Sequence, residues 1–232
     1  MNKRLWTAFA IMVAAVLAIL IIWKNDQPNG DIDISGIDIE KLVTVEDIEK
    51  DNIPDHYIGN VNSKIIVIGY EDFACVHCAQ LSSTFKNIME DYQDRVLFIY
   101  RNFSLNYPNS IVSQSAAEAA YLLGGTESYW KMHELLFQDD STWTGQAIPT
   151  ERRRELLSQF AEETNLNVDD FLKAIENYRG NGILTKINRD SEMGKKAGIT
   201  GTPVWFVNGK QVDELTDSAV RQAIDEALKS TE

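Results

Sequence analysis

The chain has 232 residues, 44% of them hydrophobic, and a formal net charge of −13. This length and composition suit one sizeable globular domain, and the negative balance argues against a nucleic-acid partner, because phosphate contacts need a basic face. Ten acids against two lysines between residues 25 and 60 supply −8 of that charge. The rest of the chain is only mildly acidic, so its charge indicates little about a substrate.

Residues 1–24 are predicted to be a transmembrane signal-anchor. The 19 residues from 5 to 23 contain no charged side chain, and as a helix they would reach roughly 28 Å, close to the hydrocarbon thickness of a bilayer. Trp6 and Trp23 stand near the two ends, where interfacial aromatic residues are enriched. A cleaved signal peptide with an unusually long apolar core is the alternative.

The charges around this segment predict its orientation. Lys3 and Arg4 precede it, and residues 25–55 after it form an acidic linker. The positive-inside bias therefore predicts a single-pass protein of the cell membrane, with its N-terminus in the cytoplasm and its body outside. Whether the segment is kept or cleaved, Cys75 and Cys78 are expected in an oxidising compartment.

Residues 56–107 are predicted to form the first half of an α/β domain. The apolar, β-branched run at 64–70 indicates a buried strand, and the run at 95–103 indicates a second one. Between them, apolar residues from 75 to 92 recur at spacings of three and four, which predicts a helix. Strand, helix and strand in this order make a βαβ unit with a parallel pair of strands.

Residues 108–198 show helical patterns, and about five helices are expected, too many for a simple crossover. We therefore predict an all-helical subdomain inserted into the α/β domain. One of its helices has a glycine pair at 124–125, which suits a helix C-terminus. Residues 199–232 return to strand, with an Asn-Gly hairpin turn at 208–209, and close with an amphipathic helix.

The only two cysteines, Cys75 and Cys78, stand in "FACVHC", where the first strand gives way to the helix. Residues i and i+3 of a first helical turn meet the Cα spacing of a disulfide, so the pair can open and close with little backbone movement. Unpaired N–H groups and the dipole at the helix start favour a Cys75 thiolate, and His77 is expected to favour it further. A pair whose reduced form is stabilised is a strong oxidant.

Three other interpretations of the pair remain. A structural disulfide across so short a loop would stabilise weakly. A zinc site would need about four ligands, but His77 lies inside the pair, and His56 and His133 lie before the first strand and in the helical insertion. Copper delivery would use two thiolates, usually with a distal histidine. The βαβ context favours the redox interpretation with no metal, and His133 is expected to be a packing residue.

The other half of the site is expected in "GITGTPVWFVNG", where Pro203 follows Thr202 at the start of a strand. An X-Pro bond can be cis at a modest free-energy difference, usually in a tight turn. A trans proline at a strand start is common in general. With a C-x-x-C motif elsewhere in the chain, we expect a cis Pro203 that faces the two cysteines.

Together, "YEDFACVHCAQL", "YWKMHELLF" in the helical insertion and "AGITGTPVWFVNGK" are similar to motifs of the DsbA-like thiol-disulfide oxidoreductases, and most similar to membrane-anchored members with a thioredoxin fold. The resemblance covers about residues 57–228. It implies a thioredoxin-like fold, with Cys75 as the attacking nucleophile and Cys78 as the partner that resolves with it. It also implies Pro203 as the cis-proline of the substrate groove and Thr202 as the adjoining residue that tunes the redox poise.

The chain departs from this family at two positions around the motif. Val76 stands where the family often has proline, and Gly69 stands where many members carry a buried glutamate that accepts a proton. Only Glu71 and Asp72 lie nearby. Asp72 matches an acid common three residues before the first cysteine and is expected to tune the thiolate. The alternative is that it is only a helix-start or solvent-facing acid.

These observations predict an extracytoplasmic enzyme that introduces disulfide bonds into exported proteins by exchange at Cys75 and Cys78. It is expected to need no prosthetic group, to be a monomer and to act on reduced exported polypeptides. The resemblance implies a quinone-linked membrane protein that reoxidises it. A reductase or isomerase of the same fold and a copper-binding chaperone are the alternatives. Trp143 is expected to rim a substrate surface from a loop.

Overall fold

The computed structural model describes residues 53–230 of the chain. The predicted transmembrane segment and nearly all of the acidic linker lie outside these residues. Within the described residues, no helix combines the length and the apolar character needed to cross a membrane. The signal-anchor at residues 1–24 therefore stays a prediction.

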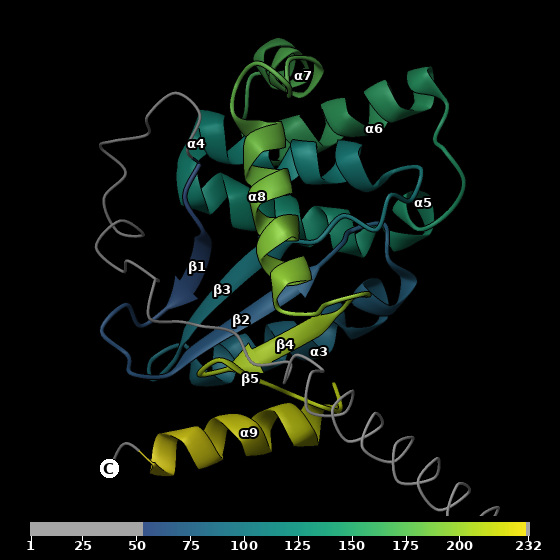
Figure 1. The fold of residues 1–232 in the computed structure, drawn as a ribbon. Coiled ribbons are helices and arrows are strands. Elements are labelled where there is room, and N and C mark those ends of the chain that lie inside the picture. Colours follow the sequence, from purple (N-terminus) through teal and green to yellow (C-terminus); the bar gives the residue numbers. More distant parts are fainter. Residues whose placement is uncertain (1–52, 231–232) are drawn as a thin grey trace, which may run out of the picture.

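A five-stranded sheet forms the centre of the described part, with the strand order β1-β3-β2-β4-β5 (Figure 1). The parallel pair that the βαβ pattern predicts is β2 and β3, and every other neighbouring pair is antiparallel. The predicted hairpin turn joins β4 to β5, with positive φ at Asn208 and Gly209. The strands are β1 (His56–Gly59), β2 (Ile66–Glu71), β3 (Leu97–Asn102), β4 (Val204–Val207) and β5 (Lys210–Gln211).

Two helices, α3 (Val76–Tyr92) and α9 (Asp217–Lys229), pack against one face of the sheet. Side chains alternate along a strand, so every second residue of β2 points to this face. The face is closed by aromatic packing, because the rings of Phe85 on α3 and Trp205 on β4 lie 4.1 Å apart between centroids. Thr216 caps α9 by accepting a hydrogen bond from a backbone amide of its first turn.

The predicted helical insertion is confirmed, and its helices lie above the sheet in Figure 1. The short helix α5 was not predicted, because four residues are too few to show a helical repeat. The insertion comprises α4 (Ser110–Gln138), α5 (Asp140–Trp143), α6 (Thr150–Glu163), α7 (Val168–Glu176) and α8 (Ile183–Lys196).

The helix α4 is two helical segments joined at the predicted glycine pair. Gly125 has φ 71° and ψ −161°, which is not helical, and only glycine reaches such angles without a steric penalty. The first segment begins beside the cysteines, and the second continues over α3. The prediction that a helix ends at residues 124–125 is confirmed.

A buried set of charges, which we call the ionic seam, joins the helical insertion to the sheet and consists of Asp55, Arg101, Lys186 and Asp190. The Arg101 guanidinium donates to the Asp55 carboxylate at 2.6 Å, and the Lys186 ammonium lies between Asp55 and Asp190. Burial alone would raise the pKa of Asp55, but the charges of Lys186 and Arg101 outweigh it and hold that pKa below its usual range. The seam is therefore a buried cluster in which the negative charges of two carboxylates are balanced by the positive charges of Arg101 and Lys186.

Candidate active site

The chain passes from β2 into α3 at the two cysteines, as the sequence predicts. Cys75 is the N-cap of α3, with extended backbone angles (φ −90°, ψ 119°), and Cys78 lies in the first turn. Both are free thiols, Cys75 with 2% of its surface exposed and Cys78 with none. Val76 and His77 between them are exposed. The sulfur atoms thus lie just beneath the surface, at the turn from β2 into α3. We call this turn, residues 71–78, the cysteine corner.

Asp72 fixes this corner from inside and does not face the solvent. One carboxylate oxygen accepts from the Ala74 amide at 3.0 Å, and the other accepts from the Leu105 amide at 2.9 Å and the Ser110 hydroxyl at 2.6 Å. Burial raises the pKa of Asp72, and these hydrogen bonds oppose the rise. The solvent-facing alternative for Asp72 is wrong, because its three donors hold the carboxylate between the cysteine turn and the start of α4.

The structure confirms the cis peptide bond at Thr202-Pro203. Antiparallel pairing of β2 with β4 brings this peptide to the cysteines, since Tyr70 on β2 is the register partner of Val204. The Cys75 thiol donates to the Thr202 carbonyl oxygen at 3.3 Å. Two segments 127 residues apart in the chain therefore meet at the sulfur of Cys75.

The surroundings of the two thiols shift their pKa values in opposite directions. The hydrogen bond from the Cys78 thiol is the main cause that lowers the pKa of Cys75 to about 5, against the effect of burial. The Thr202 side chain and the backbone amides of Cys78 and His77 lower this pKa further. Burial raises the pKa of Cys78 well above its ordinary value, and Cys75 adds to that rise. Near neutral pH, Cys75 is therefore the thiolate and Cys78 the thiol.

A buried acid lies beside this pair at Glu71. Its carboxylate accepts from the Trp205 indole N–H at 2.8 Å, and burial raises its pKa to about 8. A side chain at Gly69 would collide with the same indole, because a Cβ there would lie 2.9 Å from its nitrogen. Gly69 and Glu71 point to the same face of the sheet. Trp205 thus fills the space beside Gly69, and the buried acid stands two residues further along β2.

Comparison with known proteins supports this architecture. A family model described as Thioredoxin matches residues 51–226 of the chain. The chain belongs to the thioredoxin family. The thioredoxin-like fold with a helical insertion, expected from the motifs, is confirmed.

Two solved structures illustrate the fold of this thioredoxin-family chain. BdbD from Bacillus subtilis, in its oxidised form, matches with a TM-score of 0.62 at 23% identity, over 75% of this chain and 93% of that one. The thiol-disulfide exchange protein alpha-DsbA2 from Wolbachia pipientis matches with a TM-score of 0.61, also at 23% identity, over 75% of this chain and 87% of that one. At this identity the likeness shows the fold alone.

Curated relatives match over only part of their own length. An Na⁺/H⁺ antiporter, NhaA 3, of Salinispora tropica is 30% identical over 68% of this chain, which spans 22% of that protein. A Rickettsia conorii protein provisionally named a protein-disulfide oxidoreductase is 26% identical over 75% of this chain and 61% of its own length. Family membership is therefore shown, while the activity and partners are matters for proposal.

The three histidines differ in their surroundings. It is the amide of His77 that favours the Cys75 thiolate, so a role for its exposed imidazole stays a prediction. His133 packs edge-on against Phe73 and Tyr100, and burial lowers its pKa to about 3, which fits the predicted packing role. His56 lies 2.8 Å from the Glu118 carboxylate. Within residues 53–230, no group of three or more His, Cys, Asp or Glu side chains could hold a metal ion.

The expectation for Trp143 is wrong, because its side chain is fully buried and cannot rim a substrate surface. It ends the short helix α5, and the Asn109 side chain holds that segment inward by donating to the Trp143 carbonyl oxygen at 3.0 Å. Neither the role of Ser110 nor the pairing of Glu71 with Trp205 is among the predictions from the sequence. The alternation along β2 could have shown that Gly69 and Glu71 share a face.

Proposed function

We propose that this chain is a thiol-disulfide oxidoreductase that introduces disulfide bonds into exported polypeptides by exchange at Cys75 and Cys78. The observation that carries the proposal is the pair of thiols with opposite pKa shifts, set beneath a cis-proline peptide whose Thr202 carbonyl contacts the Cys75 sulfur. Such a pair has one sulfur suited to attack and departure and one that is held protonated.

The exchange begins with the Cys75–Cys78 disulfide. A client thiolate attacks Cys75 Sγ, the Cys75–Cys78 bond breaks, and Cys78 leaves as a thiolate. A second client thiolate then attacks the client sulfur of this mixed disulfide, and Cys75 leaves as the more stable thiolate. The client has lost two electrons and carries a new disulfide, while Cys75 and Cys78 have gained them.

The proton that Cys78 needs after departure has a nearby source. A Cys78 thiolate in this buried position has a high pKa, and Glu71 lies close enough to raise that pKa further. With a pKa of about 8, Glu71 is itself protonated at neutral pH. We propose that Glu71 gives its proton to Cys78 during opening of the disulfide and takes it back during closure.

Access to Cys75 needs a small local movement, since the residue is only 2% exposed. A side chain at Gly201, next to the cis peptide, would have no heavy atom within 4 Å, and Val76 on the other side is exposed. A client chain can therefore approach Cys75 through the open space beside Gly201 and Val76. We expect the client backbone to lie along the Thr202-Pro203 peptide and to replace its contact with the sulfur.

The same shifts support a flow of electrons from the client to the Cys75–Cys78 pair. Stabilising the Cys75 thiolate lowers the free energy of the reduced form, which makes the disulfide a better oxidant. The apolar segment at residues 5–23 supports a tether to the cell membrane with the described residues on the outer side. A quinone-linked membrane protein is the reoxidising partner that we propose, because the reduced pair must pass its electrons on.

The test is oxidation of a reduced, unfolded protein by the purified chain, with glutathione disulfide supplied to reoxidise the Cys75–Cys78 pair. We expect catalytic turnover for the wild type, none for Cys75→Ser, and a trapped mixed disulfide when Cys78→Ser meets an oxidised client. Equilibration of the pair with glutathione then decides the direction. A potential near that of thioredoxin, about −270 mV, would indicate a reductase and contradict the proposal.

A further inference from the structure

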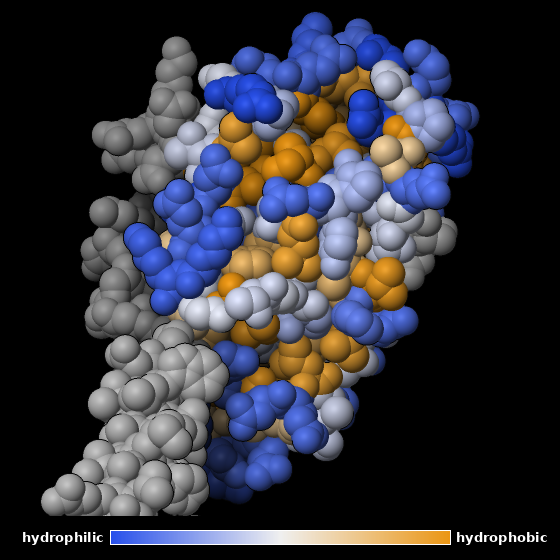
Figure 2. Space-filling view, turned by 45° about the vertical axis from the view of Figure 1, so that its right-hand side comes forward, coloured by the Kyte–Doolittle hydropathy of each residue, from blue (hydrophilic) through white to orange (hydrophobic). Residues whose placement is uncertain are grey.

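A groove in the helical insertion opens next to the cysteine corner. It lies between α4, α6 and α7, has a volume of about 370 Å³, and we call it the α4–α6–α7 groove. That volume is within the range of specific binding sites, roughly 300–1,000 Å³. Its floor is apolar and is formed by Pro108, Ile111, Val112, Leu157, Leu172 and Ile175. Figure 2 shows apolar surface enclosed by hydrophilic residues on this part of the molecule.

The groove is continuous with the active site along the chain. Ser110, whose hydroxyl donates to Asp72 at 2.6 Å, directly precedes Ile111 of the groove floor. Tyr107 precedes Pro108 of the floor and is 46% exposed. Burial and then the charge of Cys75 raise the pKa of Tyr107, so its hydroxyl lies within electrostatic reach of the active-site sulfur. A chain bound at Cys75 can therefore continue over Tyr107 into the groove.

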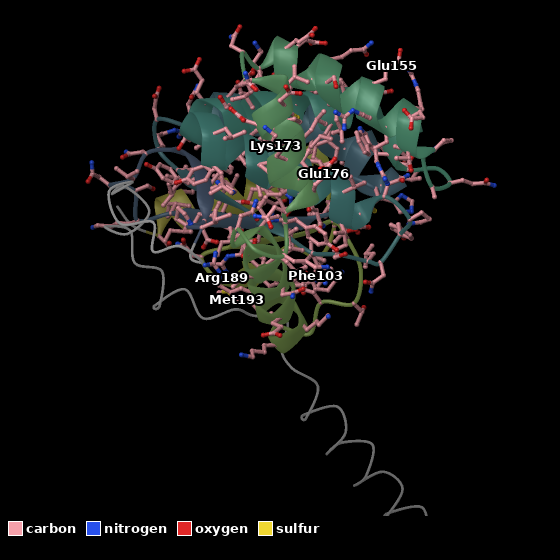
Figure 3. All side chains as sticks on the ribbon, turned by 90° about the horizontal axis from the view of Figure 1, so that it is seen from above. Phe103, Glu155, Lys173, Glu176, Arg189 and Met193 are labelled. Atoms are coloured by element: carbon pink, nitrogen blue, oxygen red, sulfur yellow. The ribbon has the colours of Figure 1, made fainter. Side chains whose placement is uncertain are left out.

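The charges at the rim leave one cation without a counter-ion. Of three consecutive arginines on α6, Arg152 pairs with Glu155 at 2.8 Å, and Arg154 pairs with Glu176 of α7 at 3.6 Å. Figure 3 labels both of these acids, seen from above. Arg153 lines the groove between them and has no ion pair to any residue from 53 to 230.

The wall of the groove also holds an unpartnered polar group. Ser115 lines the groove, is 1% exposed, and its hydroxyl has no hydrogen-bond partner among the described residues. A buried hydroxyl without a partner is unfavourable, so a ligand that supplies one gains binding free energy. The groove therefore offers an apolar floor, a hydroxyl and a cation with no protein counter-ion.

We propose that the α4–α6–α7 groove binds a segment of the client polypeptide in which an apolar side chain adjoins a carboxylate, with the carboxylate paired to Arg153. The proposal rests on the thiol-disulfide exchange function and specifies its client. The apolar side chain enters the floor, and the segment lies several residues from the exchanging cysteine along an extended client chain, which advances about 3.3 Å per residue. Because Glu176 is already paired with Arg154, the charge of Arg153 makes the rim of the groove net positive.

The test compares exchange rates of dithiol peptides with the oxidised full chain at low ionic strength. The peptides carry Ile-Glu, Ile-Gln or Ala-Glu about five residues before or after a cysteine. We expect Ile-Glu to react with a kcat/KM about two- to five-fold above Ile-Gln, the range of one half-exposed ion pair, and about ten-fold above Ala-Glu. Added salt should reduce the first ratio and leave the second.

Two arginine variants locate the effect. Arg153→Gln should bring the Ile-Glu to Ile-Gln ratio to about one and leave the Ile-Glu to Ala-Glu ratio unchanged. The control Arg152→Gln removes a neighbouring arginine that does not line the groove and should keep both ratios. A wild-type Ile-Glu to Ile-Gln ratio of one, or a preference that survives Arg153→Gln, overturns the proposal.

Two further outcomes are distinct. If the peptides react without preference but Arg153→Gln slows reoxidation of the reduced chain by membranes, the groove serves the reoxidising partner, and the client proposal is wrong. If neither the peptides nor a reduced unfolded protein is oxidised, the exchange function itself fails, and the inference fails with it. Exchange without a peptide preference therefore contradicts only the groove proposal, whereas the absence of exchange contradicts the proposed function as well.

Discussion

The ionic seam and the cysteine corner both bury carboxyl groups, but only the seam places cations beside them. In the seam, Arg101 and Lys186 hold the pKa of Asp55 low in spite of its burial. At the corner, Glu71 and Asp72 accept only from neutral donors, and burial raises the pKa of both.

The two arrangements suit different roles, one in stabilising the fold and the other in proton transfer. A buried carboxylate with a cation beside it stays ionised across the physiological range and holds two elements together. A buried carboxyl with only neutral donors can gain or lose its proton near neutral pH, which suits proton transfer. The comparison predicts that charge removal should destabilise the seam, whereas at the corner it should slow exchange and raise stability.

The largest effect is expected from Lys186→Met, which leaves two carboxylates of the seam without their shared buried cation. Removing one partner of a buried ion pair typically lowers the free energy of unfolding by about 3–5 kcal/mol. Lys173→Met is the matched control, because Lys173 is exposed and pairs with Asp170 at 3.7 Å, and about 0–1 kcal/mol is expected there. Urea denaturation measures both, and equal losses would contradict the role of the seam.

The corner can be tested next through the pH dependence of Cys75. The alkylation rate of the reduced chain should be half-maximal at about pH 5 and fall tenfold for each pH unit below it, because only the thiolate reacts. Since the folded pKa is depressed, the thiolate stabilises the reduced fold fully above the unfolded thiol pKa of about 8.5. This stabilisation declines as the pH falls and is gone below about pH 5.

Cys78→Ser sharpens this measurement. The Cys78 thiol is the largest cause of the depressed pKa, and a serine hydroxyl donates from a shifted position. We expect the midpoint to move upward, toward the ordinary thiol pKa of about 8.5. A wild-type midpoint already near that value would show that the corner does not stabilise a thiolate.

Much of this corner could be predicted from local sequence. The strand-to-helix turn at Cys75 and Cys78 follows from apolar spacing within thirty residues, and the cis bond at Pro203 was expected once a C-x-x-C motif was found. These features depend on short-range patterns or on one well-defined motif, which a single sequence displays.

The rest depends on contacts between distant residues. The burial of Glu71 is completed by Trp205, 134 residues later in the chain, and no local pattern links the two. Trp143 was placed wrongly for the same kind of reason, since the Asn109 side chain holds its segment inward across 34 residues. Local spacing shows which residues share a face, but it does not show which partner closes over them.

A smaller effect is expected from Glu71→Gln, compared in the oxidised forms so that no thiol titrates. Glu71 has a folded pKa of about 8, above the unfolded value of about 4.3, so its contribution to stability is full below pH 4.3 and declines up to about pH 8. The glutamine keeps an acceptor for Trp205 and removes this decline. The variant should therefore be the more stable protein at pH 8 and similar to the wild type near pH 4.

The same variant should exchange more slowly, by about ten-fold, because no acid remains to protonate Cys78. Glu90→Gln on the exposed side of α3 is the control and should change neither property. Stopped-flow oxidation of a dithiol peptide measures the rate. Parallel pH profiles of stability for the wild type and Glu71→Gln would show that Glu71 is an ordinary, permanently charged acid.

The smallest effect is expected from Ser110→Ala, which removes one of the three donors to Asp72. Asp72 keeps the amides of Ala74 and Leu105, so the free energy of unfolding should fall by only about 1 kcal/mol. Its pKa should rise further, because one hydrogen bond to the ionised form is lost and burial is unchanged. Ser158→Ala, which removes an exposed hydroxyl, should have no measurable effect. If Ser110→Ala matches this control while peptide exchange keeps its wild-type rate, Asp72 is held by its backbone donors alone, and the link between the cysteine turn and α4 is not needed for catalysis.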